Sequence, residues 1–148
     1  ISEKTELVML DLNQYIKGEL RKAEKGGFPL SIMFLNFVNE RMEELNKTNL
    51  VSLLFENMKD LFWDTDIFIR FMGRYYFGIF PFCDEKDKSV VEGKMKARFD
   101  EIRRGNRELA DYRMISVFVS YPSDIGDTSV VQDLLSQRIR DTFTDIQL

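Results

Sequence analysis

Apolar residues recur at spacings of three or four in four segments of the chain, which is the pattern of helices that bury one face. The first segment runs from Thr5 to Lys25 and is followed by Gly26-Gly27. Glycine is common where a helix ends, so the pair marks the C-terminus of this helix. The other predicted helices span Asn39–Phe62, with a break near Lys47–Asn49, then Glu85–Arg104 and Ser129–Phe143.

Four shorter segments are rich in β-branched and aromatic residues, and these predict strands. The run Leu30–Val38 is almost continuously apolar, as expected of a central strand that is covered on both faces. Two aromatic runs on either side of Gly73 predict a β-hairpin with a tight turn. The predicted strands span Leu30–Val38, Ile67–Phe71, Tyr75–Phe80 and Met114–Tyr121.

The order of these elements predicts the fold class. A hairpin combined with crossover helices implies a mixed sheet with helices packed on it. We therefore predict an α/β (α+β) fold with a ferredoxin-like βαββαβ core and a mixed, mostly antiparallel sheet. No linker, repeat or low-complexity segment divides residues 1–148, so we expect a single domain. The chain begins at Ile1 without a methionine, and we expect it to be cut from a longer protein.

The amino-acid composition limits which chemical roles the chain can have. The chain has no histidine, which removes the commonest general base and metal ligand. Its single cysteine, Cys83, allows no intrachain disulfide, and we interpret it as a small apolar filler after a strand. A net charge of −4 argues against a surface for nucleic acid, because that affinity comes from clustered Lys and Arg. The longest uncharged stretch is too short to span a bilayer.

The predicted hairpin carries a family resemblance. Residues 70–81 read Arg-Phe-Met-Gly-Arg-Tyr-Tyr-Phe-Gly-Ile-Phe-Pro. This run resembles the signature of the GGDEF family, bacterial diguanylate cyclases that condense two GTP into cyclic di-GMP. The family pattern is Arg, an aromatic residue, Gly-Gly-Asp-Glu-Phe, four apolar or small residues, and Pro. It aligns without a gap from Leu50 to Pro81, and the order of elements agrees along nearly the whole chain. The resemblance implies the same ferredoxin-like core.

The resemblance also implies a metal site whose positions differ here. In the family, Mg²⁺ is held by an Asp at the end of the first strand and by the acidic third residue of the signature. Those positions are Asn36 and Arg74. Mg²⁺ prefers anionic oxygen ligands, whereas Asn36 offers a neutral carbonyl and Arg74 a positive charge. The resulting degenerate signature loop consists of Met72, Gly73, Arg74, Tyr75 and Tyr76, with Tyr75 at a position that is normally Glu.

Substrate positions implied by the resemblance differ as well. The family's Asn and Asp that meet guanine align with Glu44 and Leu45, and the phosphate-contacting Lys of the last helix falls near Ile146. Losing metal, guanine and phosphate contacts together removes a route to phosphoryl attack. We therefore predict that the chain is not an enzyme, with no catalytic residue, metal or cofactor.

A second family site lies just before the signature, where an Arg-x-x-Asp motif binds the product. The corresponding residues are Trp63 and Asp66, so the Asp is kept and the Arg is replaced. Because Arg is the residue that clamps phosphate or stacks on guanine, we expect no product inhibition of the usual kind. We interpret Trp63 as a core or interface anchor, with base stacking as the alternative.

Three functions are open at this point. The favoured interpretation is a catalytically inactive GGDEF-like regulatory or protein-interaction module in bacterial cyclic di-GMP signalling, located in the cytoplasm. Its expected partners are other domains of the same protein, a signalling protein, or a second copy of the chain, and no nucleic acid or membrane. The alternative is a sensor that binds GTP or cyclic di-GMP without turnover, in which Arg74 and Asn36 form a relic site. The third is an RNA-binding sheet that uses aromatic strand residues such as Tyr75 and Tyr76.

Overall fold

The structure is a computed structural model that describes residues 6–7, 9–71, 75–124, 133–135, 137–138 and 140–141. Its strands are β1 (Glu6–Leu7), β2 (Leu30–Val38), β3 (Ile67–Phe71), β4 (Tyr75–Pro81) and β5 (Arg113–Tyr121). Its helices are α1 (Met9–Gly26), α2 (Thr48–Met58) and α3 (Lys88–Arg104), with short 3₁₀ turns η1 (Lys59–Leu61), η2 (Glu85–Asp87) and η3 (Arg107–Leu109).

The strands form one sheet in the order β1-β3-β4-β2-β5. Strand β2 runs antiparallel to both of its neighbours, β4 and β5, and β3 runs antiparallel to β4. The short β1 adds a parallel edge beside β3. The sequence β2-α2-β3-β4-α3-β5 is the ferredoxin-like βαββαβ core, so the predicted fold class is confirmed.

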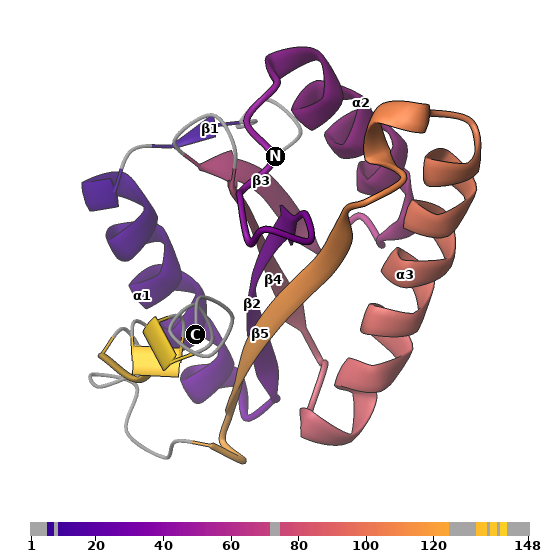
Figure 1. Cartoon of the computed structure of the whole chain (residues 1–148). Coiled ribbons are helices and arrows are strands. Elements are labelled where there is room, and N and C mark those ends of the chain that lie inside the picture. Colours follow the sequence, from indigo (N-terminus) through magenta and orange to yellow (C-terminus); the bar gives the residue numbers. More distant parts are fainter. Residues whose placement is uncertain are drawn as a thin grey trace.

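The sheet is covered on both faces, as Figure 1 shows: α1 lies on one side, and α2 and α3 lie on the other. Side chains alternate along a strand, so β2 supplies both cores. Met33, Leu35 and Phe37 pack towards α2 and α3, whereas Ile32 and Phe34 pack towards α1. All nine residues of β2 are buried, which confirms the prediction of a central strand covered on both faces.

The second predicted helix is shorter than its apolar pattern suggested. It was expected over Asn39–Phe62, but α2 begins at Thr48, where the sequence had indicated a break. Before it, the side chain of Asn39 accepts hydrogen bonds from the backbone N–H groups of Arg41 and Glu43, both at 2.9 Å. Asn side chains compete in this way for the amides that a helix would use, so residues 39–47 form a turn instead.

The ends of the chain differ in smaller ways. Helix α1 begins at Met9 and not at Thr5, and it ends at the predicted glycines, with Gly27 at a φ of +69°. Of the predicted final helix, the described residues 133–135, 137–138 and 140–141 are helical, and the others lie outside the described residues. Within the described chain, none of the helices combines the length and apolarity needed to cross a membrane.

Candidate functional site

The position of the family's first metal ligand is Asn36, near the end of β2. Its side chain is completely buried, and its Oδ1 accepts a hydrogen bond of 2.8 Å from the Phe37 N–H. Its Nδ2 has no hydrogen-bond partner among the described residues. One atom of the buried amide is therefore hydrogen-bonded, whereas the other is a buried donor with no partner in the described part of the chain.

Tyr75 and Glu44 meet close to Asn36. Tyr75 is half-buried, with its ring 5.4 Å from that of Phe34, and its hydroxyl donates a 3.0 Å hydrogen bond to Glu44 Oε2. Glu44 is placed there by a β-bridge to Val38 at the end of β2. The structure thus joins a signature position to a position that the resemblance assigns to guanine binding, and no local pattern in the sequence indicates that these two side chains pair.

Tyr76 belongs to the core and not to this site. Only 1% of it is exposed, and its hydroxyl donates a 2.7 Å hydrogen bond to the Val51 carbonyl in α2. Burial raises the pKa of its phenol. Met72, Gly73 and Arg74, the rest of the predicted signature loop, lie outside the described residues.

The described residues do not fit the Mg²⁺ that the resemblance implies. Asn36 offers a neutral amide oxygen that already accepts the Phe37 N–H. Among the described residues there is also no cluster of three or more His, Cys, Asp or Glu side chains that suits a metal ion. No step of a mechanism is therefore derived through a metal.

The second predicted site forms a tight turn. The Trp63 N–H donates to Asp66 Oδ2, and the Asp66 N–H donates to the Trp63 carbonyl, both at 2.9 Å. Burial raises the pKa of the Asp66 carboxyl, against opposing effects of the Trp63 N–H and the Lys94 charge. Trp63 is 71% exposed, so it is not a core residue, and its interpretation as an interface anchor stays a prediction. The backbone turn presents the ring to solvent.

Beside this turn lies a groove of about 280 Å³, which we call the Trp63 groove. It runs between residues 61–66, the end of β4 with residues 82–83, and the first turn of α3. Among the described residues, only Trp63, Phe82 (59% exposed) and Val90 (58% exposed) are large exposed hydrophobic residues, and all three line it. The sequence analysis did not single out Phe82 and Val90, since each becomes notable only when the fold brings it beside Trp63.

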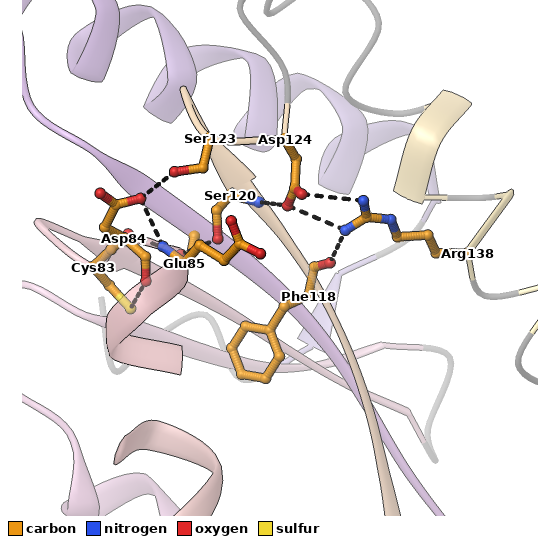
Figure 2. Close-up of polar contacts among 9 residues, drawn as sticks. Cys83, Asp84, Glu85, Phe118, Ser120, Ser123, Asp124 and Arg138 are labelled. Carbon is orange, nitrogen blue, oxygen red and sulfur yellow. Dashed lines mark hydrogen bonds and ion pairs between the residues drawn. The ribbon is translucent and has the colours of Figure 1, made fainter. Parts of the chain in front are cut away.

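A polar network joins the ends of β4 and β5 across the start of β2, which lies between them (Figure 2). The Ser31 hydroxyl donates to the Cys83 carbonyl and also meets the Ser120 hydroxyl, both at 2.8 Å. The Ser123 hydroxyl bonds to Asp84, whose Oδ1 accepts the Glu85 N–H at 2.6 Å. The segment on one side of the groove is thereby tied to the sheet. Cys83 is buried after the strand, as predicted.

On the opposite side of this network, Arg138 binds β5 and the turn that follows it. Its two Nη atoms lie 3.1 Å from the two carboxylate oxygens of Asp124, and Nη1 also donates to the Phe118 carbonyl at 2.6 Å. Asp124 Oδ2 accepts the Ser120 N–H at 2.7 Å. Burial acts to raise the pKa of Asp124, but these hydrogen bonds and the guanidinium charge outweigh it and lower the pKa.

Comparison with known proteins identifies the fold. The structure is similar to the GGDEF domain of PA1120 from Pseudomonas aeruginosa, with a TM-score of 0.68 and 11% identity over 90% of this chain and 82% of that one. It is similar to the active GGEEF domain of a Vibrio cholerae diguanylate cyclase, with a TM-score of 0.65 and 11% identity over 86% of this chain and 85% of that one. It also resembles the P. aeruginosa diguanylate cyclase SiaD, which was solved in complex with its activator SiaC. The TM-score is 0.61, with 11% identity over 95% of this chain and 54% of that one. No family model and no curated protein matches the sequence.

The chain therefore has the fold of GGDEF domains, and the predicted resemblance is confirmed at the level of the fold. The same comparison corrects the prediction that the chain is not an enzyme. Proteins that share the fold include diguanylate cyclases, one of them described as active, and this finding contradicts the prediction. The prediction relied on changed side chains such as Arg74, which lies outside the described residues.

Proposed function

We propose that this chain is a signalling domain of the cyclic di-GMP system that regulates another domain or protein by binding it. The observation that carries the proposal is the gathering of Trp63, Phe82 and Val90 in one groove of a GGDEF fold. Contiguous exposed apolar side chains mark interaction surfaces more often than scattered ones do. A neighbour with the same fold, SiaD, is solved in complex with an activator protein, which supports a protein partner.

The proposed module is a single cytoplasmic domain within a longer protein. Its partner is then a neighbouring domain, a separate signalling protein or a second copy of the chain. In each case the output is a change in the activity of a protein that makes, degrades or reads cyclic di-GMP.

Expression in a bacterial host tests this proposal. We expect the chain to change the cellular level of cyclic di-GMP more in a host that contains other cyclases and phosphodiesterases than in a host deleted for all other cyclases. An equal change in both hosts would come from turnover by the chain itself and would contradict regulation through a partner. No change of the cyclic di-GMP level in either host would also contradict such regulation.

A second candidate function is the binding of GTP or cyclic di-GMP as a sensor. The fully buried Nδ2 of Asn36, which has no partner among the residues that the structure describes, favours it, because a buried donor of this kind is a natural contact for a polar ligand. Thermal unfolding with millimolar GTP or cyclic di-GMP, with and without Mg²⁺, tests this function. A ligand at 100 times its Kd stabilises by roughly 2.7 kcal/mol and raises the midpoint by about 5–10 °C. A shift that disappears in Arg74→Ala supports the sensor, and no shift with either nucleotide excludes it.

A further inference from the structure

We propose that the Trp63 groove binds a basic amphipathic segment of a partner protein, which places an apolar side chain in the groove and a Lys or Arg beside it. This inference rests on the proposed function and names the surface and the chemistry of the partner.

The lining of the groove suits an apolar side chain. Leu61, Phe62 and Phe80 line it behind the exposed rings. An apolar anchor inserted here would cover these surfaces together with Trp63, and Trp is among the residues that most often dominate binding energy at interfaces.

The two segments that carry the exposed rings are held in place before any partner binds. The backbone of Trp63 is fixed by its two hydrogen bonds with Asp66. The ring of Phe82 stacks on Phe28 at 4.5 Å, and the Phe82 N–H donates a 2.7 Å hydrogen bond to the Pro29 carbonyl. Because these segments need little ordering on association, the entropy cost of binding is reduced.

The charge around the groove selects a basic partner. Residues 59–66 and 81–94 carry seven acidic side chains and four lysines, which gives these two segments a net charge of −3. The whole chain has a net charge of −4. Asp66, Asp87 and Lys94 line the groove itself. Burial raises the pKa of the Cys83 thiol beside it, and repulsion of the thiolate by Asp87, Asp66 and Asp84 adds to the increase. A negative surface attracts Lys and Arg and disfavours phosphate groups.

Peptide selection tests the inference on the complete chain. Random peptides displayed on phage are selected against it, and the enriched peptides are synthesised without tryptophan. We expect them to combine Leu, Ile or Phe with a neighbouring Lys or Arg. Trp63 is the single tryptophan of the chain, so its fluorescence emission should move to shorter wavelength as a peptide covers it. Calorimetry should show at least about a tenfold loss of affinity in Trp63→Ala.

Matched variants separate charge from packing. Asp66→Asn should weaken peptide binding and reduce its dependence on salt, whereas Asp111→Asn removes the same charge from an exposed position beyond the far end of α3 and should change neither. Val90→Asp places a charge at an exposed position and should abolish binding while leaving the unfolding midpoint close to that of the wild type.

Several results would overturn the inference. Enriched peptides without basic residues would show that the charge of the groove does not select a basic partner. Peptide binding retained in both Trp63→Ala and Val90→Asp would show that the peptide binds at another surface. A fluorescence shift caused by cyclic di-GMP or by raising the protein concentration alone would assign the groove to a nucleotide or to a second copy. If Trp63→Ala preserves the cellular cyclic di-GMP response, the groove inference fails and the proposed function stands. If the wild-type chain gives no response, the proposed function fails whatever the peptides do.

Discussion

Tyr75 and Tyr76 are neighbours in the chain but belong to opposite faces of the sheet, because side chains alternate along a strand. Tyr75 packs against Phe34 and reaches Glu44, whereas Tyr76 lies among the rings of Phe37 and Phe68, each 5.7 Å away. Tyr76 is buried and Tyr75 is half-buried.

Removing the Tyr76 hydroxyl should lower stability moderately. Tyr76→Phe loses the bond to the Val51 carbonyl, and we expect a decrease of about 1 kcal/mol in the free energy of unfolding, measured by urea denaturation. Since burial raises the pKa of Tyr76 above its ordinary 10.0, the neutral phenol stabilises the fold below pH 10, and this contribution is lost as the pH rises further. Tyr76→Phe should therefore flatten the alkaline loss of stability, and Tyr112→Phe serves as a control. An unchanged alkaline slope would contradict the assignment.

Gly78 allows the ring of Phe80 to lie against β4. A Cβ at Gly78 would stand 2.4 Å from Phe80 Cζ and 3.1 Å from Met33 Cε, both in a packed core. Gly78→Ala should therefore destabilise the domain by about 1–3 kcal/mol through overpacking. Gly93→Ala is a matched control, because no atom lies within 4 Å of its added Cβ and alanine favours the helix. Equal thermal midpoints for Gly78→Ala and the wild type would show that the ring moves aside freely.

At the scale of elements, the described C-terminal helical residues are joined to the sheet through Arg138. Its guanidinium binds Asp124 with both Nη atoms and the carbonyl of Phe118 in β5 with one of them (Figure 2). Paired, charge-assisted bonds of this kind are stronger than single neutral ones. Leu135 completes the attachment by packing into the core on the α1 face.

Arg138→Met should weaken this attachment and lower the free energy of unfolding by about 1–3 kcal/mol. Arg140→Met is the matched control, because Arg140 is exposed and, among the described residues, bonds to Gln137 of its own helix. Differential scanning calorimetry of both variants provides the measurement. Equal effects of the two substitutions would contradict a special role for Arg138.

The same pair predicts an acid dependence. The pKa of Asp124 is lowered below its ordinary 3.8, so its stabilising contribution is present above pH 3.8 and is lost as the pH falls through the lower folded-state value. In Arg138→Met the folded-state pKa should return towards 3.8, and the loss of stability below that pH should become less steep.

At the scale of the whole molecule, two hydrophobic cores lie on opposite faces of one sheet and share its strands. Strands β2 and β4 contribute residues to both cores, so neither core can be exposed without disturbing the other. We therefore expect the chain to unfold as the single domain that the sequence predicts, in one cooperative transition.

Chemical denaturation followed by far-UV and near-UV circular dichroism tests this expectation. The two signals report helix content and aromatic packing, and they should give coincident midpoints. Tryptophan fluorescence is a poor probe here because Trp63 is already exposed in the folded state. Two separated transitions would show that the faces of the sheet unfold independently.

The sequence by itself determined the order of strands and helices, the burial of Leu30–Val38 and the fold class, because these depend on periodicity and on local backbone preferences. The predicted start of the second helix was wrong, because hydrogen bonds of the Asn39 side chain to nearby backbone N–H groups form a turn there instead. The signature run at Arg70–Pro81 was enough to indicate the GGDEF fold, since it spans a hairpin in which spacing and geometry are coupled.

Only the tertiary structure decided how distant side chains meet. Tyr75 contacts Glu44 across 31 positions of the chain, and Trp63, Phe82 and Val90 come from three separate segments. Their juxtaposition depends on how the end of β4 and the first turn of α3 pack beside the turn at Trp63, and no local pattern encodes it. The exposure of Trp63 has the same origin. The sequence alone predicts burial for a large apolar residue, and only the packing of the neighbouring elements leaves this one exposed.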